Sequence, residues 1–181
     1  MTRLFISLLF LCVFVPCISG QSSEVSFDAV GLEKVSPSVV ITTWAQGVYN
    51  TPTEDPRTVY LLLNTGGAVQ PDLSEDFEKE IKQWLSAHPG AQAVVMYTVA
   101  GQSFRGGWTF KPVWIVDKED ILNLYLVRKG ACRYEYMLPE SQVERRPAVA
   151  EYQIKVLHKM LTDAELSARK ERLGIWADKE K

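Results

Sequence analysis

The stretch Leu126-Val127-Arg128-Lys129-Gly130-Ala131 ends a short predicted helix over residues 120–129, and Gly130 has the place of a helix C-cap. A second stretch, residues 164–176, reads AELSARKERLGIW and ends a longer helical pattern that begins near residue 151. Apolar residues recur at helical spacing in both regions, which indicates that each helix buries one face. The C-terminal third therefore predicts two amphipathic helices, each ending shortly before or at a glycine.

Outward from these stretches, the sequence alternates strand and helix patterns. β-Branched and aromatic runs predict strands over residues 39–44, 47–50, 57–63, 93–99, 108–116 and 132–137. Asp72 and Glu75 have capping-box spacing and open a predicted helix that His88-Pro89-Gly90 stops. This order of elements predicts an α+β fold, mainly β, in the form of a five-stranded OB-fold barrel with about three helices.

Three residues add detail to this prediction. Pro112 interrupts the fifth strand, which favours a bulge or an edge position there. Thr162 with Glu165 repeats the capping-box spacing, so residues 151–173 form either one helix or two helices with a break. Cys132 lies in an alternating run, and we expect it to be a small buried residue rather than a catalytic thiol.

The first twenty residues have the layout of a signal peptide. Arg3 gives a positive start, an uncharged apolar run follows to Pro16, and small residues end the segment at Gly20. A membrane anchor is the alternative, but the apolar run is shorter than the ~20 residues that a bilayer requires. Lipoprotein processing at Cys17 is disfavoured because Pro16 stands where such sites carry a small residue.

These observations predict the domain organisation. We expect residues 1–20 to be a cleaved signal peptide, residues 21–37 an N-terminal linker or arm, and residues 38–178 the domain. The mature chain is then secreted or periplasmic, with no transmembrane span.

The charge of the chain argues against a general nucleic-acid-binding surface. The whole chain has a formal net charge of −2, and loss of Arg3 with the leader makes the mature chain more negative. Acidic residues outnumber basic residues over residues 21–127, and the reverse holds over residues 128–181. A local basic surface is therefore expected only in the C-terminal part.

The two stretches that end the helices resemble the staphylococcal-nuclease-like (thermonuclease) domain family. Residues 126–131 are similar to the LVRxGxA run of that family, and residues 164–176 are similar to its AExxARxxxxGIW ending. The resemblance is good over residues 114–176 and weaker but collinear over residues 39–110. It implies the OB-fold barrel and, in active members, phosphodiester cleavage that uses a calcium ion, a glutamate and two arginines.

The residues that this chemistry requires are replaced. Where the family has an Asp-Gly-Asp-Thr turn, this chain has Ala45-Gln46-Gly47-Val48. Asn64 and Thr65 match an Asp-Thr pair without its charge, and Gly67 stands at the position of the glutamate. One arginine position falls on Val59 or Tyr60. The second falls within residues 102–107, where Arg105 lies, or nearer Phe110 or Lys111.

These replacements favour a non-catalytic binding or structural module, and we predict no catalytic residue, no metal site and no cofactor. The candidate binding residues in the barrel groove are Asn64, Thr65, Arg105 and Lys111, and the ligand classes are protein, carbohydrate or single-stranded nucleic acid. The alternative is a secreted calcium-dependent nuclease with a rearranged active site built on Glu54, Asp55 and Arg57. A third possibility is a domain that acts only as a subunit of an assembly.

Overall fold

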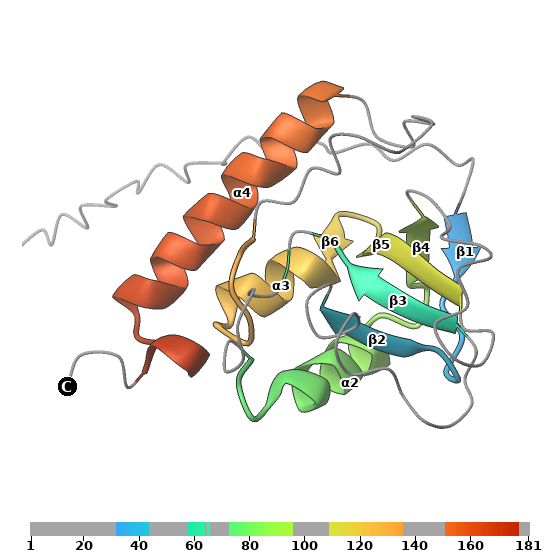
Figure 1. The fold of residues 1–181 in the computed structure, drawn as a ribbon, viewed down its shortest axis with the longest axis horizontal. Helices are drawn as coiled ribbons and strands as arrows, with labels where there is room; N and C mark the ends of the chain where they lie inside the picture. Colours follow the sequence, from blue (N-terminus) through green and yellow to red (C-terminus); the bar gives the residue numbers. More distant parts are fainter. Residues whose placement is uncertain are drawn as a thin grey trace, which may run out of the picture.

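A computed structural model of the chain describes residues 32–43, 58–63, 65, 73–95, 109–135 and 151–177. The expected signal peptide, most of the expected arm, the expected strand at residues 47–50, and residues Asn64 and Arg105 lie outside the described residues. The described part is a mixed fold of one sheet and three α-helices, with α3 lying between α4 and the sheet (Figure 1). None of the described helices has the length and apolar character required to cross a bilayer.

Six strands form the sheet, in the spatial order β1-β4-β5-β3-β2 with β6 beside β5. β2 and β5 are both parallel to β3, whereas β4 runs antiparallel to β1 and β5. The strands are β1 (Leu32–Lys34), β2 (Val40–Thr43), β3 (Thr58–Leu62), β4 (Gln92–Val95), β5 (Thr109–Asp117) and β6 (Asp120–Ile121). β5 is the longest strand and occupies the centre, so it joins the two halves of the sheet.

The described strands form an open sheet rather than the expected closed five-stranded barrel. β1 and β2 lie at opposite ends of the strand order, and the described register contains no pairing between them. The expected first strand pairs in parallel with β3 as β2, and within the described residues a further strand, β1, precedes it at Leu32–Lys34. Helices also contribute as much as strands, so the fold is mixed rather than mainly β.

The open sheet is nevertheless strongly curled. β4 and β5 separate β1 from β3, which would place β1 and β3 about 14 Å apart in a flat sheet. The Glu33 carboxylate on β1 nevertheless accepts a hydrogen bond from the Tyr60 hydroxyl on β3, at 3.2 Å. Side chains on one face of a flat sheet stand parallel and would not meet over that distance. The sheet therefore has a concave face onto which Glu33 and Tyr60 converge.

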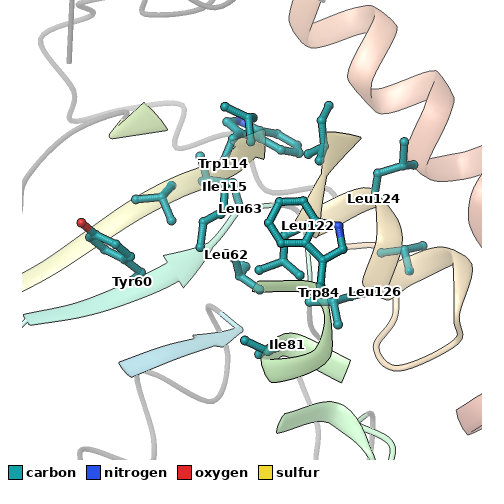
Figure 2. Close-up of a cluster of buried hydrophobic side chains, with 14 of the residues drawn as sticks. Tyr60, Leu62, Leu63, Ile81, Trp84, Trp114, Ile115, Leu122, Leu124 and Leu126 are labelled. Carbon is teal, nitrogen blue, oxygen red and sulfur yellow. The ribbon is translucent and has the colours of Figure 1, made fainter. Parts of the chain in front are cut away.

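The main hydrophobic core joins buried residues of β3, β4 and β5 to the helices α2 (Phe77–Ala87), α3 (Leu122–Arg128) and α4 (Glu151–Lys170), and α4 packs on α3. Figure 2 shows Trp84 and Ile81 of α2 beside the leucines of α3 and the end of β3. The expected apolar faces of the helices are confirmed, because the residues at helical spacing are the buried ones: Phe77, Ile81, Trp84, Leu122, Leu126, Leu157, Leu161, Ala164 and Ala168.

Helix α2 begins later than the capping-box spacing predicts. Its first residue is Phe77, and Asp76 occupies the N-cap without a side-chain hydrogen bond. Leu73 forms a β-bridge with Cys132, and the Ser74 backbone N–H donates to the Ala131 carbonyl at 2.9 Å. These contacts hold residues 73–74 against residues 131–132, so the helix cannot start at residue 72. Cys132 is fully buried as expected, but the predicted strand at 132–137 consists, where described, of isolated bridges.

Of the alternatives left open for residues 151–173, the structure has the single helix, and the bulge or edge position expected at Pro112 is not found. Helix α4 is continuous, because the Thr162 hydroxyl donates to the His158 carbonyl one turn earlier, at 2.9 Å, instead of capping a new helix. Pro112 lies in the central strand in register with Leu61. The Val113 carbonyl accepts from Leu63 of the β3 segment, so the adjacent Pro112 nitrogen faces β4, whose register with β5 ends at Val113. Its missing N–H therefore breaks no described ladder bond.

The two stretches that end the helices meet in the structure. Gly130 has a φ of 65° and follows α3, and Gly174 has a φ of 50° and begins the short 3-10 helix η1 (Gly174–Trp176). The Ile175 N–H donates to the Gly130 carbonyl at 2.9 Å. A Cβ on Gly174 would lie 2.1 Å from the Gly130 carbonyl oxygen, so this backbone contact leaves room only for glycine. We call this contact the glycine junction.

Candidate functional site

Three polar side chains from three strands meet on the concave face of the sheet, and we call Glu33, Tyr60 and Lys111 the carboxylate cluster. The Lys111 ammonium donates to both carboxylate oxygens of Glu33, at 2.8 Å each. The Tyr60 hydroxyl donates to one of these oxygens at 3.2 Å. One carboxylate therefore receives three hydrogen bonds from two donors, of which one is charged.

The register of the two central strands places the donors side by side. Tyr60 of β3 pairs with Lys111 of β5, and the next pair on the same face, Leu62 with Val113, belongs to the main core. Tyr60 is the middle residue of β3 and Lys111 the third residue of β5, whereas α3 contacts β5 and β6 and begins directly after β6. In Figure 2 the Tyr60 hydroxyl points away from the leucine-rich centre of the core. The carboxylate cluster is therefore the polar end of a face that is otherwise apolar.

Burial makes the carboxylate cluster an unusual place for charge. Tyr60 is 2% exposed, the Lys111 side chain 20% and the Glu33 side chain 40%. Burial, followed by the negative charge of Glu33 and the hydrogen bond to it, raises the pKa of Tyr60 to about 12. Tyr60 therefore remains a hydrogen-bond donor at neutral pH. The two donors can hold an anionic oxygen group.

The structure separates the expected binding residues. Thr65 is 1% exposed, and its hydroxyl donates to the Leu62 carbonyl at 2.8 Å while its backbone bridges to Tyr134. Thr65 thus follows the C-terminal end of β3, whereas Lys111 pairs with Tyr60 in the middle of that strand. A role of Lys111 in binding stays a prediction, as does any role of Asn64 and Arg105.

Glu33 is the member of the carboxylate cluster that sequence analysis missed. It lies in the segment expected to be a linker, and the run Leu32-Glu33-Lys34-Val35 alternates too briefly to predict a strand. β1 exists because it pairs with β4, with Glu33 opposite Ala93 and the Val35 N–H donating to the Ala91 carbonyl. This pairing joins residues that are distant in the sequence, so no local signal could indicate it.

On the opposite face of β3 and β5, the adjacent register pair is apolar. Val59 pairs with Phe110, and these two side chains form a small buried cluster with Leu61. Val59 is 0% exposed and Phe110 7%. The same two strands therefore present a neutralised polar pair on one face and a buried apolar pair on the other.

A second group of polar contacts joins α4 to the segment after α3. The Tyr134 backbone N–H donates to the Glu165 carboxylate at 2.6 Å, and Arg169 binds the other oxygen of Glu165 and lies over the Trp176 ring, with the guanidinium carbon 4.0 Å from the ring centre. The Tyr134 hydroxyl also contacts the His158 ring nitrogen. These contacts are structural, because they join α4 to the segment after α3 and to Trp176 of η1, next to the glycine junction. Within the described ranges, no group of three or more His, Cys, Asp or Glu side chains is placed to hold a metal ion.

Comparison with protein-family models gives no match for this chain, and comparison with curated proteins gives none either.

Proposed function

We propose that the chain is an exported, catalytically degenerate staphylococcal-nuclease-like domain that acts as a non-catalytic binding module. The observation that carries the proposal is the register of β3 and β5. The resemblance places one catalytic arginine at Val59 or Tyr60, and the other either within residues 102–107, where Arg105 lies outside the described residues, or near Phe110 or Lys111. Where described, these positions form two cross-strand pairs, Val59 with Phe110 and Tyr60 with Lys111.

Neither pair offers a free positive charge to a phosphodiester. Val59 and Phe110 are buried and apolar. Tyr60 and Lys111 are both engaged by the Glu33 carboxylate. A catalytic arginine stabilises charge that develops in the transition state, and a cation already paired with a carboxylate supplies much less of that stabilisation. The substitutions at both positions therefore support loss of catalysis.

Several features support the finer proposal of an OB-fold barrel. β3 and β5 run parallel, β4 lies antiparallel between β5 and β1, and the sheet curls towards closure. The glycine junction brings together the two stretches that carry the family resemblance. We propose that residues 47–50, as a further strand, complete the barrel, and that its groove binds an extended protein, carbohydrate or single-stranded nucleic-acid ligand.

The test is hydrolysis of fluorescence-quenched single-stranded DNA and RNA by residues 21–181, with calcium and with a chelator. We expect no cleavage above that of a mock preparation, because the metal-binding carboxylates, the glutamate and at least one arginine are replaced. Chelator-sensitive cleavage that Arg57→Ala or Arg105→Ala abolishes would instead establish a secreted calcium-dependent nuclease with a rearranged site. An exposed-lysine control, Lys118→Ala, should leave any such cleavage unchanged.

A further inference from the structure

The carboxylate cluster divides into a fixed part and a part that is easier to replace. The donors, Tyr60 and Lys111, lie on β3 and β5, which pair with strands on both sides. The acceptor, Glu33, lies on β1, a three-residue edge strand that pairs only with β4 in the described sheet. Short edge segments open at lower free energy than central strands, so the donors remain in place when the acceptor leaves.

The donors require an anion whenever Glu33 is absent. The Lys111 side chain is only 20% exposed, and a largely buried ammonium without a counter-charge is strongly destabilising. The Tyr60 hydroxyl, at 2% exposure, also requires an acceptor. Glu33 satisfies both with a planar carboxylate whose two oxygens each lie 2.8 Å from the Lys111 nitrogen. The geometry therefore matches a carboxylate group rather than a single oxygen atom.

We propose that Tyr60 and Lys111 form a binding site for a ligand carboxylate, which Glu33 occupies as a built-in competitor while β1 pairs with β4. This inference rests on the proposed binding function and names the chemical class of ligand. The 40% exposure of the Glu33 side chain gives solvent access to the site. A ligand carboxylate enters by replacing Glu33, so the affinity of the wild-type chain for it is set by the stability of β1 on the sheet.

Chemical rescue tests this site directly. The mature chain with Glu33→Ala is melted in increasing sodium acetate at constant ionic strength and pH 7, beside the wild type. We expect Glu33→Ala to lower Tm and acetate to restore it saturably, because acetate replaces the missing carboxylate. The wild type should bind acetate at least about tenfold more weakly, because an intramolecular competitor acts at an effective concentration in the millimolar range or above.

Two matched variants separate this site from general salt effects. Glu33→Ala with Lys111→Met should lose the rescue, because the ammonium is gone while an apolar chain of similar length remains. Glu78→Ala removes an exposed carboxylate whose partner Lys82 lies 4.0 Å away, and acetate should not restore its stability. If Glu33→Ala does not fold in any acetate concentration, Glu33→Gln keeps the shape of the side chain, and acetate should then shift the Lys111 side-chain NMR resonances saturably.

The outcomes are distinct. Acetate that stabilises Glu33→Ala no more than Glu78→Ala, or that leaves the Lys111 resonances of Glu33→Gln unchanged, overturns the carboxylate site. Inorganic phosphate that rescues Glu33→Ala better than acetate overturns the assignment of the ligand class. Nuclease activity of the wild type would refute the proposed non-catalytic function without affecting acetate rescue, so the two failures can be told apart.

Discussion

The glycine junction and the carboxylate cluster are held together in opposite ways. At the junction, two backbones touch, and a carbonyl oxygen fills the space that a side chain on Gly174 would need. In the cluster, three long polar side chains from β1, β3 and β5 converge, and those of Glu33 and Lys111 keep contact with solvent. A backbone contact restricts residue type at each position, whereas a side-chain cluster can be built from many combinations. This difference explains why local sequence patterns indicated the glycine junction but not the carboxylate cluster.

The largest effect is expected at the junction. Gly174→Ala should lower the free energy of unfolding by about 3 kcal/mol or more, because φ is +50° and the new Cβ would lie 2.1 Å from a backbone carbonyl oxygen. Urea denaturation measures the loss. Gly90→Ala is the matched control, since its Cβ would meet only the Asp117 side chain, at 3.1 Å, and should cost about 1 kcal/mol or less. Equal effects of the two substitutions would show that the junction is not under tight backbone contact.

A buried polar group on the helix side provides an intermediate test. The Asn123 side chain is 0% exposed, accepts from the Ile115 N–H and donates to the carbonyls of Leu63 and Val113. Asn123→Ala should cost about 2–3 kcal/mol, because it leaves buried backbone groups without partners. Differential scanning calorimetry of the variant checks this value. A loss smaller than that caused by Gly90→Ala would mean that water replaces the hydrogen bonds of the Asn123 amide.

The smallest effect concerns the pH dependence of stability in the carboxylate cluster. Folding raises the pKa of Tyr60 from 10.0 to about 12, mainly through burial. The folded chain therefore keeps a proton that the unfolded chain releases, so this contribution to stability is complete below pH 10 and is lost as pH rises from about 10 to about 12.

Tyr60→Phe should therefore make stability fall less steeply with pH in that window than in the wild type. Urea unfolding at a series of alkaline pH values, with the tyrosinate absorbance recorded in parallel, measures the slope. Tyr125→Phe is the control on the helix side, because the pKa of Tyr125 is also raised to about 12 by burial and by Glu80. If Tyr60→Phe leaves the slope unchanged while Tyr125→Phe reduces it, Tyr60 is not held as a protonated donor.

Local patterns were sufficient for some elements of the fold. The predicted strands at 39–44 and 57–63 contain β2 and β3, and the predicted helix at 120–129 contains α3 with Gly130 after it. Each of these depends on residue types within one short segment. The start of α2, by contrast, is set by the contact of residues 73–74 with residues 131–132. Capping-box spacing at Asp72 could not reveal that contact.

Other features depend on pairing between distant segments. Pro112 breaks no ladder bond of the described residues, because the described register of β4 with β5 reaches only Val113, which is a property of the sheet and not of the local sequence. In the candidate site, the sequence indicated Lys111 as a candidate binding residue within a predicted strand. Its partner Glu33 lies in β1, a three-residue strand that pairs only with β4 in the described sheet. Closure of the barrel was likewise a fold-level expectation, and β2 pairs in parallel with β3 instead.

The central position of β5 also determines when the chain can fold during synthesis. β5 pairs with β3, β4 and β6, and β1 reaches the sheet only through β4. The two halves of the sheet, β1 with β4 and β2 with β3, cannot be joined before residues 109–117 have been made, and the glycine junction requires residues 174–175 as well. Distant pairings of this kind slow folding and leave strand edges uncovered meanwhile. The two halves of the sheet therefore remain separate until more than half of the chain has been synthesised.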